Sequence, residues 1–245
     1  MYPTLFRIGD FEVTTFGLMV GVAALVALWI FRRALARGGL PESGVDAAVA
    51  GVLGGLAGAK LLWTVEHAGE APVADLFLSR GGMSWFGGLL GGVGAGLWML
   101  RRRSIPWLSG LSAAAPALAV GHAVGRIGCF LVGDDYGRPT DMPWGVAFPE
   151  GLPPTDVPVH PTQLYEALLL VPVAWILFRW RRRGASDRAV VGGYLLMAGM
   201  VRFAIEFIRV NERVIGPLTV AHLISLAIAT AGLVLLLKRR PAPAS

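Results

Sequence analysis

The sequence predicts an all-α integral membrane protein with seven transmembrane helices, the N-terminus outside and the C-terminus in the cytoplasm. Three observations predict this class. The chain of 245 residues is 55% hydrophobic and only 16% charged, with a mean hydropathy of +0.62, whereas soluble chains are about a quarter charged. Seven apolar stretches approach or exceed the roughly 20 residues that a helix needs to cross a bilayer. Basic residues gather in short clusters between these stretches.

The seven stretches follow one another with short polar connections. Before the first stretch stands only Arg7, and its basic residues come after it, which is the reverse of the order in a signal peptide. The last three stretches are the most clearly apolar. The predicted spans are 13–31, 45–65, 84–100, 107–131, 162–180, 189–209 and 217–237.

Small residues recur every four positions in the second and third stretches. The repeating positions are Gly51, Gly55 and Ala59, and then Gly88, Gly92 and Gly96. Faces of this kind let helix backbones approach closely in lipid. We therefore expect these glycines to pack helices together.

The distribution of Lys and Arg predicts the orientation, because these residues accumulate on the cytoplasmic side. With the N-terminus outside, fourteen of the 22 fall in cytoplasmic segments. The fourteen are Arg32, Arg33, Arg37, Arg101, Arg102, Arg103, Arg179, Arg181, Arg182, Arg183, Arg188, Lys238, Arg239 and Arg240. Only four fall in outer loops.

We expect one domain, residues 1–240, followed by a disordered Pro/Ala tail at 241–245. The domain includes a long outer loop, 132–161, whose many Pro and Gly residues disfavour a helix. Loops of this length are often functional. We expect the loop to cover a pocket, with a plain connector as the alternative.

The charged residues inside the predicted spans all fall in the outer half of the membrane. Lys60 and Arg126 lie near the outer ends of their stretches, and Arg202, Glu206 and Arg209 share one face of the sixth. A charge in hydrocarbon costs about 3 kcal/mol or more, so each needs a partner or a function. The pattern favours a polar pocket open to the outer leaflet over an ion pore, which needs polar groups through the full thickness.

Arg126 is the strongest candidate for ligand binding. No acidic residue lies one turn away on its own helix, so Asp134 or a bound anion is the candidate partner. Arg202 and Glu206, in contrast, are expected to form an i, i+4 ion pair, and snorkelling is the alternative for Lys60. Arg126 and Arg209 together suit a phosphodiester, because a guanidinium can bind two phosphate oxygens at once.

Several other classes of protein are excluded. Cys129 is the single cysteine, which excludes a disulfide framework and a multi-cysteine metal site. The four histidines lie in different segments without ligand spacing, so we expect no metal and no cofactor. The net charge of +6 does not indicate nucleic acid, because the arginines lie on loops between spans.

Five motifs stand out in order along the chain. They are Phe16-Gly17-Leu18-Met19; Gly81-Gly82-Met83-Ser84-Trp85 followed by Gly87-Gly88-Leu89; Gly125-Arg126-Ile127-Gly128-Cys129-Phe130 with Gly133-Asp134 and Gly137-Arg138; His160-Pro161-Thr162-Gln163-Leu164-Tyr165-Glu166; and Phe203 to Arg209. Together they resemble the signature of the bacterial prolipoprotein diacylglyceryl transferases, over about residues 5–237.

This resemblance implies a multi-pass enzyme of the bacterial inner membrane. It would transfer the diacylglyceryl group of phosphatidylglycerol to the lipobox cysteine in a prolipoprotein signal peptide and release glycerol phosphate. In the family, two arginines at the positions of Arg126 and Arg209 hold the lipid phosphate. We expect these two and His160 to be catalytic. The further substrate-binding candidates are Lys60, Asp134, Gly137, Gln163, Tyr165 and Glu206.

The chain departs from the family pattern where the thiol would be handled. Phe86 replaces the histidine usually proposed as the base, and Phe16 replaces a functional tyrosine. The two asparagines of the Gly-Arg signature are Cys129 and Val132, and its glutamate is Asp134. The arginines for the phosphate are thus kept, whereas several polar groups around them differ.

Three hypotheses follow for the activity. The first is a working transferase, because a thiol with a pKa near 8.5 is already partly ionised and a general base contributes only about 10²–10⁴-fold. His122, one turn before Arg126, is a candidate substitute base or else a structural histidine. Cys129 is a candidate nucleophile or else a small buried residue. The other two hypotheses are a paralogue acting on another acceptor and a non-catalytic phospholipid-binding protein.

Overall fold

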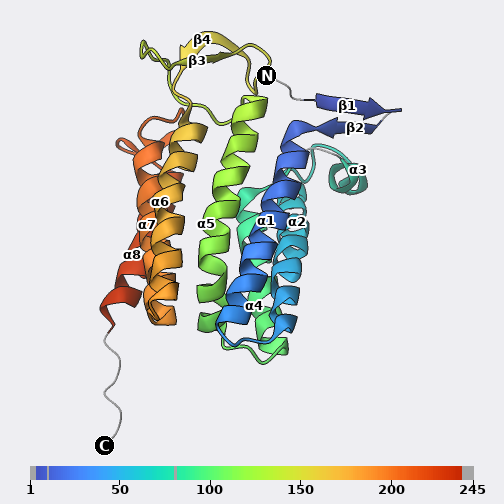
Figure 1. The fold of residues 1–245 in the computed structure, drawn as a ribbon. Coiled ribbons are helices and arrows are strands. Elements are labelled where there is room, and N and C mark those ends of the chain that lie inside the picture. Colours follow the sequence, from blue (N-terminus) through green and yellow to red (C-terminus); the bar gives the residue numbers. More distant parts are fainter. Residues whose placement is uncertain (1–3, 10, 80–81, 239–245) are drawn as a thin grey trace, which may run out of the picture. The chain divides into compact units, whose positions relative to one another are not determined.

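The computed structural model describes residues 4–9, 11–79 and 82–238, and most of them are helical (Figure 1). A short 3₁₀ helix at Glu42–Gly44 precedes the second of the long helices. The α-helices are α1 Thr15–Arg37, α2 Val45–Glu66, α3 Val73–Leu78, α4 Trp85–Arg102, α5 Trp107–Val132, α6 Thr162–Arg182, α7 Asp187–Glu206 and α8 Val220–Leu237. Each predicted span coincides with one of the long helices.

Three short antiparallel hairpins connect or precede these helices. β1 Thr4–Ile8 pairs with β2 Phe11–Thr14, β3 Val146–Phe148 with β4 Thr155–Val159, and β5 Arg213–Ile215 with β6 Leu218–Thr219. The β3–β4 pair lies within the loop 132–161, which contains no helix after Val132, the last residue of α5, as its Pro and Gly content predicts. The hairpin itself was not expected from the sequence.

Six helical segments in the described part of the chain are long and apolar enough to cross a membrane: Thr15–Arg37, Glu42–Glu66 and α5 to α8. The chain is therefore a multi-pass membrane protein. α4, which corresponds to the predicted span 84–100, is outside this set because six of its eighteen residues are Gly and it ends in Arg101 and Arg102. Gly adds little apolar surface, and two charges lower the mean hydropathy of a short helix.

The backbone contacts divide the chain into two compact units. One consists of the segments before Leu28 and after Ala113, and the other of Leu28–Ala113. In the second unit, α2 and α4 pack through glycines, as the four-residue spacing predicts. The tightest positions are Gly54, Gly58, Gly87 and Gly91, where an added Cβ would lie 2.2–2.7 Å from a backbone oxygen of the facing helix.

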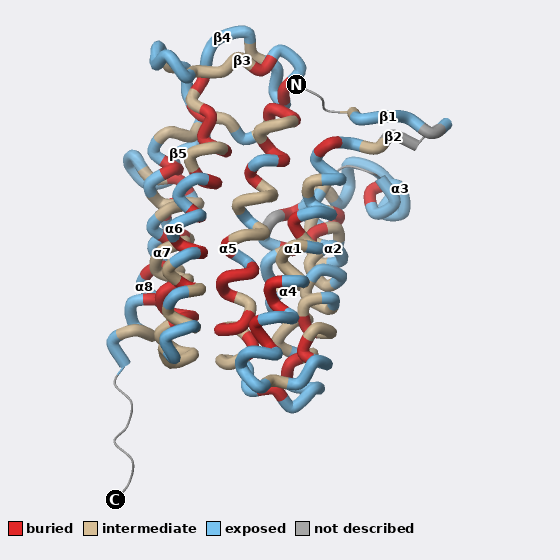
Figure 2. Tube along the Cα trace, in the orientation of Figure 1, coloured by how far each residue is buried: buried red, intermediate tan, exposed pale blue. Residues whose placement is uncertain are grey.

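The first unit has an apolar core between α5, α6 and α7. Its buried members are Ala115, Ala119, Val173, Ala174, Leu177 and Val190. α7 and α8 approach closely where Gly192 faces Gly232, whose backbone oxygen would lie 2.8 Å from an added Cβ on Gly192. Figure 2 shows buried residues recurring between exposed ones along α6, α7 and α8.

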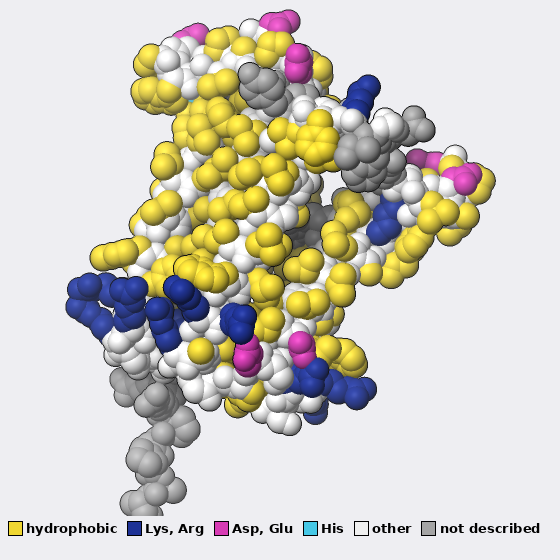
Figure 3. Space-filling model, turned by 45° about the vertical axis from the view of Figure 1, so that its right-hand side comes forward, with side chains coloured by type: hydrophobic (Ala, Val, Ile, Leu, Met, Phe, Trp, Pro, Cys, Tyr) yellow, Lys and Arg dark blue, Asp and Glu magenta, His cyan; other side chains and the backbone are white. Residues whose placement is uncertain are grey.

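The exposed residues of these helices are largely apolar. Leu168, Trp175 and Met200 are all more than half exposed. Figure 3 shows hydrophobic side chains over the helices and Lys and Arg side chains gathered near helix ends. Water would disfavour so much exposed apolar surface, whereas lipid accommodates it.

Candidate functional site

Three arginines and three carboxylates form a continuous ion network in the first unit. α5 contributes Arg126, α6 contributes Glu166, and α7 contributes Arg202 and Glu206. Arg209 lies just beyond α7, and Asp135 lies in the loop after α5. Glu166 and Glu206 are 1% and 2% exposed and Arg126 is 7% exposed, so these charges depend on one another for their stabilisation.

Glu166 and Glu206 connect the arginines on the buried side of the network. Arg126 Nε lies 2.9 Å from Glu166 Oε2, and Arg202 Nη1 lies 3.9 Å from the same oxygen. Arg202 Nη2 lies 2.7 Å from Glu206 Oε2, which confirms the predicted i, i+4 pair. Arg209 Nε lies 3.7 Å from Glu206 Oε2. Glu206 Oε1 also accepts hydrogen bonds from Asn211 and Thr219.

Asp135 connects Arg126 and Arg209 on the other side of the network. Arg126 Nη1 donates to Asp135 Oδ2 over 2.9 Å, and Arg209 Nη2 donates to Asp135 Oδ1 over 2.5 Å. Arg209 Nη1 also donates to the backbone oxygen of Asp135 over 3.0 Å. The Asp135 side chain is 46% exposed, whereas the two arginine side chains are 9% exposed. A single carboxylate thus bridges two largely buried guanidinium groups.

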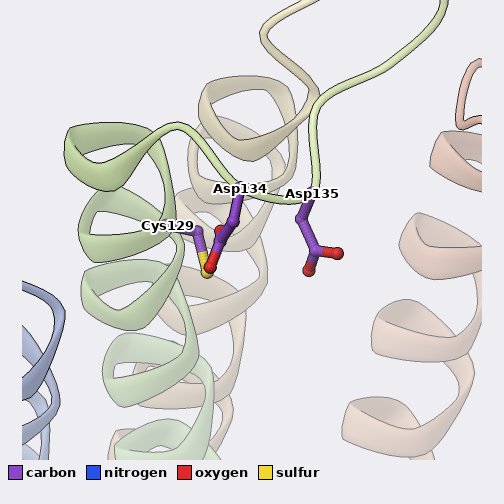
Figure 4. Close-up of side chains that lie close together, drawn as sticks. All are labelled: Cys129, Asp134 and Asp135. Atoms are coloured by element: carbon purple, nitrogen blue, oxygen red, sulfur yellow. The ribbon is translucent and has the colours of Figure 1, made fainter. Parts of the chain in front are cut away.

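The expectation that Asp134 could be the partner of Arg126 is wrong, because among the described residues the ion pairs of Arg126 are with Asp135 and Glu166. The chain turns sharply after α5, with positive φ angles at Gly133 and Asp135. This turn directs Asp134 toward the thiol of Cys129 and Asp135 away from it (Figure 4).

Burial raises the pKa of Asp134, while the thiol of Cys129 acts in the opposite direction. Burial alone would also raise the pKa of Asp135. The hydrogen bond and charge of Arg209, and then those of Arg126, outweigh it and lower the pKa of Asp135 to about 2. Asp135 is therefore ionised at neutral pH, and its negative charge is held between the two arginines.

The ends of α6 and α7 hold the turn in place. Gln163 Nε2 donates to the backbone oxygen of Asp134, and Thr162 Oγ1 donates to that of Asp135 over 2.8 Å. The backbone of Gly137 pairs with that of Arg209. An added Cβ on Gly137 would lie 2.8 Å from Ile208 O and 3.0 Å from His160 Cβ, so only glycine fits there.

His160 and Tyr165 join the start of α6 to the long loop. The phenol oxygen of Tyr165 lies 3.2 Å from His160 Nδ1 and accepts a 2.7 Å hydrogen bond from Trp144 Nε1. Trp144 was not predicted as part of a site. Its contact with Tyr165 fixes the loop against α6.

His122, on α5, lies 3.4 Å through Nε2 from Glu166 Oε1, and its side chain is 42% exposed. It is therefore joined to Arg126 through Glu166. Phe16 also belongs to this unit. Its ring would lie 3.8 Å from a Cβ added to Gly128.

Lys60 and Phe86 belong to the other unit. Lys60 Nζ donates to the backbone oxygen and the hydroxyl of Ser79, each over 2.8 Å, and lies 4.7 Å from the centre of the Trp63 ring. These contacts explain how a lysine near the end of α2 is stabilised there.

Cys129, Asp134 and Asp135 present a sulfur and two carboxylate oxygens within 4.8 Å of one another, which is close enough to hold a metal ion. The spacing of the histidines in the sequence gives no sign of this cluster. The positive charges of Arg126 and Arg209 lie against Asp135, however, and they favour an anion over a cation at this place.

These features define a multi-pass helical membrane protein with a buried arginine pair suited to an anionic group. Comparison with known proteins identifies the family. Residues 3–238 match the family model described as prolipoprotein diacylglyceryl transferase. The chain belongs to this family of transferases, as the motifs predicted.

Three relatives illustrate the similarity, each named phosphatidylglycerol–prolipoprotein diacylglyceryl transferase. The protein of Geobacter sulfurreducens is 36% identical over 98% of this chain and 97% of its own length. That of Methylococcus capsulatus is 34% identical over 96% of this chain and 94% of its own length. The protein of Vibrio cholerae is 34% identical over 87% of this chain and 81% of its own length.

Proposed function

We propose that this chain transfers the diacylglyceryl group of phosphatidylglycerol to the lipobox cysteine of prolipoproteins. The observation that carries the proposal is the arginine pair. Arg126 and Arg209 reach the two oxygens of one carboxylate, over 2.9 and 2.5 Å, and a phosphodiester presents its oxygens in a similar way. Membership of the transferase family supplies the reaction.

In this reaction the substrate thiol loses its proton and the sulfur attacks the glyceryl carbon next to the phosphate. The new carbon–sulfur bond replaces the carbon–oxygen bond, and glycerol phosphate leaves with the bonding electrons. The guanidinium groups of Arg126 and Arg209 stabilise the charge that develops on the phosphate. Fixed donors of this kind contribute about 3–4 kcal/mol each to lowering a barrier.

Because Phe86 cannot accept the thiol proton, another residue must do so. His160 lies beside Tyr165, and His122 lies beside Glu166. A neutral imidazole at either place can accept a proton. We assign proton transfer to His160, with His122 as the substitute base.

The remaining candidate residues would surround the lipid head group and the acceptor peptide. Gln163 and Gly137 support the turn that carries Asp134 and Asp135, and Glu206 orients Arg202 and Arg209. Tyr165 would close the pocket with the loop 132–161. Lys60, in the other unit, remains a candidate substrate-binding residue by its position in the sequence alone.

We further propose that α4 also crosses the membrane, which brings the number of spans to seven. They would form one domain, residues 1–240, in the inner membrane of a bacterium. The N-terminus would lie outside and the C-terminus inside. The support is the excess of basic residues at the C-terminal ends of α1, α4 and α6 and just beyond α4 and α6, which would then lie on the cytoplasmic side.

A transfer assay tests the proposed function. Purified protein in micelles containing phosphatidylglycerol is given a lipobox peptide, and mass spectrometry detects the diacylglyceryl adduct. A peptide with serine in place of the cysteine is the control. We expect an adduct on the cysteine peptide alone, and at least a hundredfold slower formation with the Arg126→Ala variant. Unchanged transfer by that variant would show that the site is elsewhere.

Phe86 and Phe16 favour a second candidate function, because they replace the groups that the family uses on the thiol side. The chain would then bind phosphatidylglycerol through Arg126 and Arg209 but serve another acceptor or none. Lipid binding that depends on Arg126, together with no adduct on any lipobox peptide, would identify this case.

A further inference from the structure

The bridge between Arg126, Asp135 and Arg209 has the geometry of an occupied anion site. The carboxylate of Asp135 uses one oxygen for each guanidinium. A phosphodiester held by the same two arginines would need the same donors. The two cannot be bound there at the same time.

We propose that Asp135 is a built-in competitor for the lipid phosphate, which must displace the Asp135 carboxylate before it can bind to Arg126 and Arg209. The inference rests on the proposed function, because it takes the arginine pair to be the phosphate site. It assigns Asp135 a part in setting the affinity for the anionic lipid.

The charges of the network support an exchange of one anion for another. Arg126, Arg202 and Arg209 carry three positive charges, and the buried residues Glu166 and Glu206 supply two negative ones. Asp135 supplies the third. Since a phosphodiester also carries one negative charge, replacing Asp135 with it would leave the balance unchanged, whereas adding it beside Asp135 would place an extra charge in a poorly solvated place.

The exposure of the three bridging groups indicates which of them can move. The arginine side chains are 9% exposed, while that of Asp135 is 46% exposed. Asp135 also sits at a φ of +60° on a turn outside the helices, a conformation that is unfavourable for most residues other than Gly, Asn and Asp. The side chain of Asp135 can therefore leave the arginines while α5 and α7 stay in place.

Arg126 retains hydrogen-bonding capacity for an incoming ligand. Its Nη1 donates to Asp135, whereas the buried Nη2 has no hydrogen-bond partner among the described residues. A tetrahedral phosphate offers more acceptor oxygens than a carboxylate, so it can use Nη2 in addition to Nη1. This difference gives the lipid an advantage that allows it to displace Asp135.

The test compares phosphatidylglycerol binding by the native protein with that by Asp135→Asn and Asp135→Gly variants. Both replacements remove the negative charge and tolerate the positive φ. Asp156→Asn is the matched control, because Asp156 is exposed on β4 and the variant changes the net charge equally. Binding is measured by thermal shift in lipid nanodiscs with increasing phosphatidylglycerol, and separately in detergent with inorganic phosphate.

We expect both Asp135 variants to bind phosphatidylglycerol about tenfold more tightly than the native protein, which is the factor for a competitor occupying nine-tenths of the sites. Asp156→Asn should bind like the native protein. If inorganic phosphate shows the same gain, the competition concerns the phosphate group itself; a gain with the lipid alone means that the rest of the lipid is needed to displace Asp135.

Equal or weaker lipid binding by both Asp135 variants would overturn the inference, since Asp135 would then hold the arginines in place. Absence of lipid binding by every protein would overturn it as well. Failure of the proposed function can be told apart from failure of this inference. In that case the Asp135 variants would still bind the lipid more tightly, but the transfer assay would give no adduct with the native protein or any variant.

Discussion

At the scale of single residues, charge and space around the turn after α5 determine what the site can bind. Asp135 balances the arginine pair, and Gly137 allows the turn to lie against α6 and the end of α7. Each residue therefore supports a prediction that can be tested alone.

The bridge formed by Asp135 should resist acid. Its pKa is lowered from an ordinary value of 3.8 to about 2, so its contribution to stability is complete above about pH 5 and is lost as the pH falls through 2. The unfolding temperature of the native protein relative to Asp135→Asn, measured in detergent from pH 2 to pH 7, should give a constant difference above about pH 5. The difference should change only below that pH. A change centred near pH 6 would assign the effect to another group, such as a histidine.

Replacing Gly137 with alanine should disturb the site from the turn. The added Cβ would meet Ile208 O and Thr162 Cγ2, each at 2.8 Å, and overpacking of this kind costs about 1–3 kcal/mol. We expect a lower unfolding temperature and at least tenfold slower transfer, the latter because Arg209 and Asp135 flank the turn. Gly125→Ala is the matched control, since no atom lies within 4 Å of its added Cβ. Equal stability of the two variants would contradict the tight fit.

The sequence predicted those parts of the site that depend on helical spacing. Arg202 and Glu206 at i, i+4 form the expected ion pair. It did not predict Asp135 as the bridging residue, because that contact requires a left-handed turn at a residue other than glycine. Glu166 appeared only as part of a motif, and its contact with Arg126 depends on how α5 and α6 pack.

At the scale of elements, helix–helix approach in the second unit depends on glycine. α2 and α4 meet where Gly54 and Gly58 face Gly91 and Gly87. Helices that pack this closely gain van der Waals contact in lipid, where the hydrophobic effect does not hold helices together. The four-residue spacing predicted that these glycines pack helices together, whereas the partner helix and the most crowded positions could not be predicted without the crossing geometry.

Gly91→Ala should destabilise the α2–α4 pair. Its Cβ would lie 2.3 Å from Gly54 O, which forces the helices apart. Gly94→Ala on the same helix has no atom within 4 Å of the added Cβ and is the matched control. We expect about 1–3 kcal/mol lower stability for the first variant and no loss for the second. Unfolding in detergent, followed by circular dichroism, measures both, and equal behaviour would mean that the helices are not in contact in solution.

The boundaries of the elements also show where sequence reasoning ends. α2, α5 and α6 agree with the predicted spans to within two residues at each end, whereas α8 begins three residues after the predicted start. α7, however, ends at Glu206, three residues before the predicted end, so that Arg209 lies in the segment that pairs with Gly137. The apolar pattern of the helix continues through Phe207 and Ile208. The helix ends earlier because the following segment pairs with a distant loop, and the apolar pattern does not predict that pairing.

At the scale of the whole molecule, the basic clusters predict an N-terminus outside and a C-terminus inside, and labelling tests this orientation. Cys129 is the single cysteine, so a Cys129→Ala background permits labelling at chosen positions. With Glu150→Cys in the long loop, we expect reaction with a membrane-impermeant maleimide in intact cells. With Arg183→Cys, between α6 and α7, we expect reaction only after lysis. The reverse pattern would show that the orientation is opposite.

The exposed carboxylate on a short turn also has a consequence for the end of the catalytic cycle. Because Asp135 is joined to α5 by two residues, it stays close to the arginines even when it is displaced, at an effective concentration in the millimolar range or above. After transfer, it competes with glycerol phosphate for the same donors. The product can therefore leave by exchange with a tethered anion, so that the two buried positive charges stay compensated. The residue that weakens binding of the substrate thus also accelerates dissociation of the product.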